Sequence, residues 1–76
     1  MLLREINIGS LTVIVEEEQG AYEIKAFEST GKRIFMHIYQ DYEIVKSAMD
    51  SITTMMEKGG VKDEDIVEIL KLSKDK

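Results

Sequence analysis

The sequence predicts an α+β domain in which a four-stranded antiparallel meander is followed by two helices. Apolar and polar side chains alternate through residues 2–39, and three short glycine-bearing segments interrupt that alternation. After residue 41 the apolar spacing changes to that of a helix. With 76 residues the chain is expected to form one domain, with the sheet at 2–39 and the helices at about 41–58 and 63–73.

Two-residue loops set the register of the first two predicted hairpins. Gly9-Ser10 has glycine at the first central position, as a type II′ turn requires. Gln19-Gly20 is taken as the second loop. The resulting pairs are Ile8 with Leu11, Ile6 with Val13 and Arg4 with Val15 in the first hairpin, and Val15 with Ile24 and Val13 with Ala26 in the second.

The third loop is predicted to contain the three residues Ser29-Thr30-Gly31, with Gly31 in the left-handed position of a G1 bulge. A two-residue loop would mix the two faces, because a slip of one residue turns every side chain of a strand over. The three-residue loop pairs Ala26 with Ile34, Ile24 with Met36 and Tyr22 with Ile38. The face beneath the helices is then aliphatic throughout and comprises Ile6, Ile8, Leu11, Val13, Val15, Ile24, Ala26, Ile34, Met36 and Ile38.

Both helices are predicted from one apolar face each and from residues that cap their ends. Asp41 is expected to cap the first helix, and Gly59-Gly60 to end it with a left-handed conformation. The second helix is expected to have Asp63 as its N-cap, acidic residues in its first turn and lysines at its end, an order that suits the helix dipole. An isolated helix of about eleven residues is marginal, so its apolar side must dock on its own sheet or on a second copy.

Composition and charge exclude several functional classes. Without cysteine the chain has no thiol nucleophile, disulfide or Cys-type zinc site. The net charge is -5, and acidic residues outnumber basic ones in both residues 1–40 and residues 41–76, which argues against a dedicated duplex-binding protein. No apolar run exceeds three residues and Arg4 interrupts the start, so neither a membrane span nor a secretory segment is expected. Few amides beside many isoleucines and charged residues fit a thermophilic cytoplasm.

The other face of the predicted sheet carries the candidate functional residues. In the predicted register Phe27 and Phe35 lie beside the cations Lys25 and Arg33, as in proteins that bind single-stranded nucleic acid. The same rings could instead fill cross-strand pairs beneath the cations, or form a self-association surface. The negative net charge disfavours nucleic acid and leaves self-association as the leading interpretation. The interface residues predicted are Ile14, Phe27, Phe35 and Tyr39 on the sheet, with Ile66 and Leu70 as a second group.

Catalytic and metal-dependent functions find little support in the sequence. His37 could hold a divalent cation together with Glu16 and Glu23, but one histidine and two carboxylates recur by chance in a glutamate-rich sheet. The serines have only His37 as a candidate base, and no glycine pattern resembles a phosphate-binding loop. No catalytic, cofactor or metal site is therefore predicted.

The order of four strands and a helix resembles two small families in topology. One is the single-strand-binding coactivator type, a four-stranded sheet plus helix that dimerises. The other is the HicB-like antitoxin type, in which a glutamate-rich turn is similar to the segment from Glu16 to Tyr22. The chain lacks the basic strands of the first type and the proline-rich segment of the second, so neither resemblance assigns a family.

The leading functional expectation is a non-enzymatic cytoplasmic interaction protein, a homodimer that serves as a small accessory subunit or adaptor for a protein partner. The alternative is a weak binder of single-stranded nucleic acid that uses Lys25, Phe27, Arg33 and Phe35. The solution mass of the native chain and of a Phe35→Glu variant is expected to distinguish the two.

Overall fold

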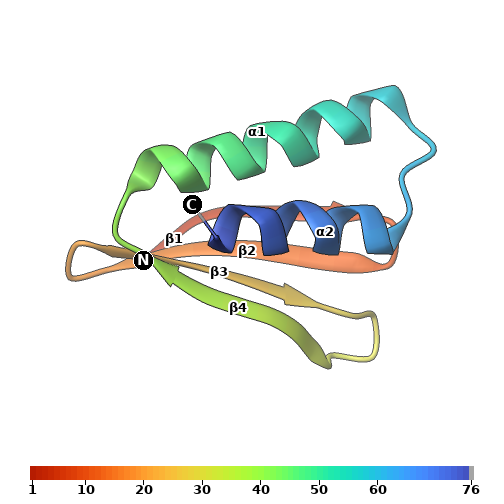
Figure 1. Ribbon diagram of the computed structural model, residues 1–76. Coiled ribbons are helices and arrows are strands. Elements are labelled where there is room, and N and C mark those ends of the chain that lie inside the picture. The colour runs from red at the N-terminus through yellow and green to blue at the C-terminus, as the bar shows by residue number, and fades with distance from the viewer. Residues whose placement is uncertain (76) are drawn as a thin grey trace.

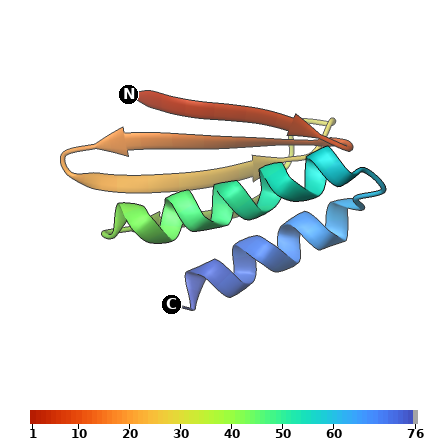
Figure 2. The same cartoon turned by 90° about the horizontal axis from the view of Figure 1, so that it is seen from above.

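The computed structural model describes residues 1–75, which form a four-stranded antiparallel sheet with both helices on one of its faces (Figures 1 and 2). The strands β1 (Leu2–Ile8), β2 (Leu11–Glu18), β3 (Ala21–Phe27) and β4 (Arg33–Tyr39) are neighbours in chain order, and α1 (Tyr42–Lys58) and α2 (Asp63–Lys74) follow. This confirms the predicted α+β fold and its element order. Within residues 1–75, no helix has the length and apolar character needed to cross a bilayer.

The first two hairpins have the predicted loops and the predicted register. Ile8 pairs with Leu11 across the first loop, and Val15 pairs with Ile24 across the second. Gly9 has φ 60°, as the first central residue of a type II′ turn must. Gln19 and Gly20 both have positive φ, which is the geometry of a type I′ turn. In both hairpins the loop type therefore determines which side chains face the helices.

The third hairpin has the predicted loop but not the predicted register. Glu28 N–H donates to Lys32 O at 2.8 Å and so closes a loop of residues 29–31, with Gly31 at φ 90°. Phe27 then pairs with Arg33, but Ala26 pairs with Phe35 because Ile34 is an extra residue in a bulge. The remaining pairs are Lys25 with Met36, Ile24 with His37, Glu23 with Ile38 and Tyr22 with Tyr39.

This bulge turns the rest of β4 over, and the prediction for that strand was wrong. Phe35 and Tyr39 lie under the helices and are 8% and 5% exposed, while Met36 and Ile38 lie on the opposite face. Aromatic side chains bury more area than isoleucine or methionine, so this register removes more apolar surface from water. It also gives the Tyr39 hydroxyl a partner in the core, as described below.

The helix ends of α1 follow the sequence signals, whereas α2 begins differently. Asp41 caps α1 by accepting a hydrogen bond from Glu43 N–H at 2.9 Å, and Gly59 ends it with φ 78°. Asp63 is the first helical residue of α2 rather than its cap, and the Asp65 carboxylate accepts from Lys62 N–H at 3.1 Å. The Asp63 side chain is thereby free to contact another element.

Helix α2 docks on its own chain through both apolar and polar contacts. Ile66 and Leu70 are 0% exposed and belong to one core with the inner sheet face and α1. The Tyr39 hydroxyl lies 2.8 Å from Ser73 Oγ, which itself donates to Leu70 O at 2.6 Å. At the other end of the helix, the Asp63 carboxylate accepts hydrogen bonds from the backbone N–H and the hydroxyl of Ser10 in the first loop.

The inner face of the sheet is confirmed for β1 to β3 and corrected for β4. Its buried strand residues are Ile6, Ile8, Leu11, Val13, Val15, Ile24, Ala26, Phe35 and Tyr39. Val45, Ala48, Met49 and Ile52 cover it from α1. The helices and the inner sheet face thus form one core, and no element within residues 1–75 covers the other sheet face.

Candidate interaction surface

The sheet face that points away from both helices is called here the outer face. Figure 1 shows both helices on one side of the sheet, so no element within residues 1–75 covers this face. Strand pairing arranges its side chains in three rows that run across the strands. The rows are Leu2, Glu16, Glu23 and Ile38; Glu5, Ile14, Lys25 and Met36; and Asn7, Thr12, Phe27 and Arg33.

Apolar side chains on the outer face form a group on β2, β3 and β4. Met36 is 41% exposed and Ile38 is 53% exposed, and both lie on the edge strand β4. Ile14 and Phe27 on the two central strands are partly buried. Adjacent exposed apolar groups on a flat sheet are typical of a protein contact surface, whereas scattered ones are ordinary.

One cation lies at the centre of the outer face between two carboxylates. Lys25 Nζ is 2.9 Å from Glu16 Oε1 and 3.3 Å from Glu23 Oε1. The hydrogen bond from Lys25 and its charge lower the pKa of Glu16, and the hydrogen bonds to Glu16 and Glu23 raise the pKa of Lys25. Each ion therefore stabilises the charged form of the other, and Lys25 is already neutralised within its own chain.

A shallow depression of about 440 Å³ lies at the end of the outer face beside the loop between β2 and β3. It is lined by Glu16, Glu18, Gln19, Ala21, Glu23, Lys25 and Ile38. Three carboxylates against one ammonium give this end of the face a negative charge. An isoleucine at its rim adds an apolar contact, so the depression fits a cationic side chain with an aliphatic stem.

The structure separates the six residues predicted to form an interface. Ile14 and Phe27 lie on the outer face, as expected. Phe35 and Tyr39 are buried on the inner face because of the bulge at Ile34, and this placement contradicts their predicted exposure. The second predicted group, Ile66 and Leu70, is also in the core, because α2 docks on its own chain instead of on a partner.

The residues of the nucleic-acid alternative do not share one face. Phe35 lies on the inner face, which leaves Phe27 as the single aromatic ring on the outer face of residues 1–75. Lys25 is held by two carboxylates, and Arg33 lies at the far end of the same face. A row of stacking rings interleaved with free cations, the usual platform for single strands, is therefore not formed.

The residues considered for a metal site are also on different faces. Glu16 and Glu23 are on the outer face, but His37 pairs with Ile24 and so belongs to the inner side. The His37 ring packs edge-on against Tyr39, with ring centroids 4.8 Å apart. Among residues 1–75, no three histidine, cysteine or carboxylate side chains are close enough together to hold a metal ion.

Sequence reasoning missed Met36 and Ile38 as surface residues. Both sets of alternating positions in β4 are largely apolar. One set contains Ile34, Met36 and Ile38, and the other contains Phe35 and Tyr39. Alternation therefore cannot choose the inward side of this strand. A preference for burying aromatic rings is the signal that favours the observed register.

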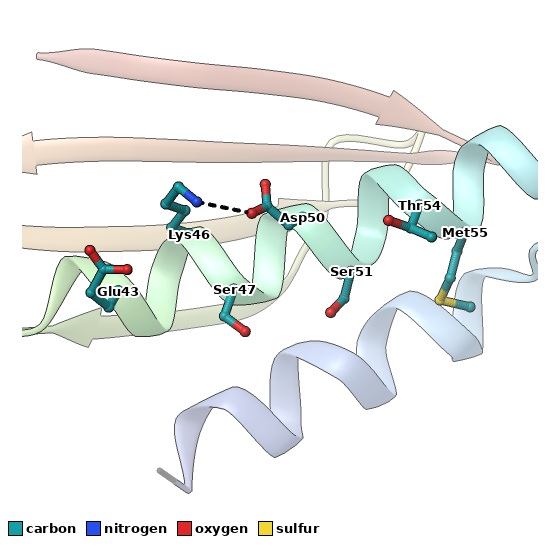
Figure 3. Close-up of a pocket in the computed structure, with 7 residues that line it drawn as sticks. All are labelled: Glu43, Lys46, Ser47, Asp50, Ser51, Thr54 and Met55. Carbon is teal, nitrogen blue, oxygen red and sulfur yellow. Dashed lines mark hydrogen bonds and ion pairs between the residues drawn. The ribbon is translucent and has the colours of Figure 1, made fainter.

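A second concave surface of about 480 Å³ runs along the exposed side of α1. Figure 3 shows its side chains spread along the helix instead of converging on one point. The one ion pair drawn there joins Lys46 and Asp50 at 3.4 Å, one helical turn apart. Its hydroxyl groups have no histidine beside them to act as a base, so this surface offers no arrangement for nucleophilic catalysis.

Comparison with protein-family models, with curated proteins and with solved structures gives no match to this chain. Functional assignment therefore depends on the geometry of the surfaces described above. Within residues 1–75 the outer face combines exposed apolar side chains with fixed charges, and it can bind a complementary surface without chemistry of its own.

Proposed function

We propose that this protein is a non-enzymatic interaction protein that self-associates through the outer face of its sheet and serves as a small accessory subunit or adaptor. The observation that carries the proposal is the exposure of Met36 and Ile38 beside Ile14 and Phe27 on an uncovered face. Dimerisation would remove these side chains from water at about 25 cal/mol for each Å² of apolar area buried.

The absence of a covering layer within residues 1–75 and the compensated charges of the outer face also support it as a contact surface. A small sheet with one open apolar face exposes that face to aggregation unless another surface covers it. Lys25 and its two carboxylates satisfy one another within each chain, so a partner does not have to neutralise a lone charge at the centre of the contact. The face therefore combines apolar contact area with charges that are already compensated.

The test is the solution mass by light scattering of the native chain, of Met36→Glu and of Leu72→Glu. Met36→Glu introduces a carboxylate among the exposed apolar side chains of the outer face and should give a folded monomer. Leu72→Glu is the matched control, because Leu72 is 57% exposed on α2 and lies in the helical layer. The native chain and this control should both be dimers, and circular dichroism should show all three folded.

A native chain that stays monomeric over a hundredfold range of concentration would contradict the proposal. Dissociation by Leu72→Glu but not by Met36→Glu would place the contact on the helices and would also contradict it. Phe35→Glu is not a usable test, because Phe35 is in the core and a charge there would unfold the chain.

A further inference from the structure

Fixed charges are distributed unequally along the outer face. Glu16, Glu18 and Glu23 lie towards the loop between β2 and β3, where the acidic depression is. Lys32 and Arg33 lie at the loop between β3 and β4 together with one carboxylate, Glu28, and neither cation makes an ion pair within residues 1–75, so this end has a net positive charge. Because successive loops of a meander alternate between its ends, these two loops are at opposite ends of the sheet (Figure 1). The face therefore has an acidic end and a basic end.

We propose that the occupant of this face is a second copy of the chain, packed sheet against sheet about a twofold axis that runs across the strands. This arrangement places Arg33 of each copy against Glu23 and Ile38 of the other copy. The inference rests on the proposed self-association and adds the orientation of the two copies. A twofold contact uses the same patch on both copies, so each favourable pair occurs twice.

The three rows of the outer face explain why the axis runs across the strands. A twofold axis along the middle row leaves that row facing itself and exchanges the two outer rows. The row that ends in Arg33 then faces the row of Glu16, Glu23 and Ile38. Met36 and Ile14 in the middle row face their own symmetry mates, as do Glu5 and Lys25. The exchanged outer rows place opposite charges on both sides of this middle row.

The alternative axis, parallel to the strands, brings like charges together. It leaves each end of the sheet facing the same end of the other copy, so the acidic depression of one copy would face that of the other. Juxtaposed like charges at an interface are unfavourable and select against an orientation. Charge complementarity therefore favours the axis across the strands.

Lys25 lies in the middle row and faces its own symmetry mate in the proposed arrangement. Glu16 and Glu23 compensate its charge at 2.9 and 3.3 Å within each copy. Two neutralised clusters meet at the axis instead of two free ammonium groups, and the roughly 30° rotation between packed sheets separates them further.

The size of the face sets the expected strength of the contact. Strands of about seven residues and four strands side by side give a footprint of roughly 450 Å². A standard stable interface buries about 800 Å² on each partner, so this dimer is small and should dissociate on dilution. Its orientation can therefore be tested by exchanging copies between preparations.

The experiment measures dimerisation by sedimentation velocity for Arg33→Glu, for Glu23→Arg and for an equimolar mixture of the two. Each variant alone should dimerise at least about tenfold more weakly than the native chain, because both contacts become repulsive. The mixture should form a heterodimer of near-native strength, because both of its contacts again join opposite charges. Lys71→Glu, the same charge reversal on the exposed side of α2, is the control and should leave the dimer unchanged.

The outcomes separate this inference from the proposed function. A native dimer whose variants do not recover on mixing overturns the orientation but leaves self-association standing. A monomeric native chain removes the proposed function itself, and binding of a basic peptide to the acidic depression would then identify a different occupant.

Salt dependence gives a second measurement that does not require Glu23→Arg to fold. Arg33 is exposed on the edge strand, so its replacement leaves the core intact. The native dimer should weaken as salt screens the attraction, whereas the Arg33→Glu dimer should strengthen as salt screens the repulsion. The same salt response in both proteins would overturn the proposed contact.

Discussion

The two faces of the sheet contain similar residue types but have different roles. On the inner face Val13, Ile24 and Ala26 are completely buried beneath α1 and α2. On the outer face Met36 and Ile38 remain largely exposed, although they are also apolar. The difference comes from the covering layer, because two helices suffice for one face only. An apolar strand residue therefore belongs to the core or to a contact surface according to what can reach it.

Truncation of one isoleucine on each face should give the largest difference in the free energy of unfolding. Ile24→Ala leaves a cavity in the centre of the core and should lower the free energy of unfolding by about 2–5 kcal/mol. Ile38→Ala should change it by less than about 0.5 kcal/mol when measured by urea denaturation at concentrations where the chain is monomeric. Equal losses at the two positions would mean that the outer face is covered within the monomer.

Two glycines in the loops test how firmly α2 is attached to the inner layer. Gly9 and Gly20 both have positive φ, so alanine at either site should cost about 1–2 kcal/mol of stability. A Cβ atom at Gly9 would also lie 2.5 Å from Asp63 Oδ1, whereas a Cβ at Gly20 meets nothing within 4 Å. Gly9→Ala should therefore cost more than Gly20→Ala in thermal unfolding, and equal costs would show that the contact with α2 is easily displaced.

Removal of the Tyr39 hydroxyl should have a smaller effect on stability, and this effect depends on pH. Tyr39→Phe removes the hydrogen bond to Ser73 and should cost about 1 kcal/mol at neutral pH. Burial raises the pKa of Tyr39 above its usual 10.0, more than the hydrogen bond lowers it. The unfolded chain then ionises first, so stability should fall as the pH rises above 10.0. Urea denaturation at neutral and alkaline pH should show a shallower loss in Tyr39→Phe than in the native chain.

Removal of the ion pairs on the outer face should have the smallest effect on the stability of the monomer. Because the pKa of Glu16 is lowered, its contribution to stability is present above pH 4.5 and is lost as the pH falls through the lowered value. The pKa of Lys25 is raised, so its contribution is lost only as the pH rises beyond 10.5. In Lys25→Met the carboxyl of Glu16 should titrate closer to 4.5 by NMR, with little change in neutral-pH stability. An unchanged Glu16 titration would indicate that the pair does not form in solution.

The sequence was sufficient to predict strand register where a loop had one sterically suitable geometry. Gly9-Ser10 and Gln19-Gly20 require positive φ at specific positions, and these requirements fix the register of β1, β2 and β3. No sequence signal marks the bulge at Ile34, because both sets of alternating positions in β4 are apolar and no glycine stands at the extra residue. An error of one residue there reversed the predicted locations of Phe35, Met36, Ile38 and Tyr39.

The candidate surface was predicted in part for the same reason. Ile14, Lys25, Phe27 and Arg33 lie on or next to the correctly registered strands, and all four are on the outer face as expected. The position of α2 depends on long-range contacts such as Ser10 with Asp63, which local patterns do not encode. Ile66 and Leu70 could therefore not be distinguished from interface residues until their neighbours in the fold were known.

The contact between Ser10 and Asp63 also bears on how the chain is made. The two residues are 53 positions apart, and the contact joins the first turn to the last helix. Phe35 and Tyr39 share one core with Ile66 and Leu70, so the core over the sheet and α1 is incomplete until α2 has left the ribosome. Folding of this domain should therefore not finish before α2 has been synthesised, and a nascent chain without α2 would expose an apolar surface that a chaperone can bind.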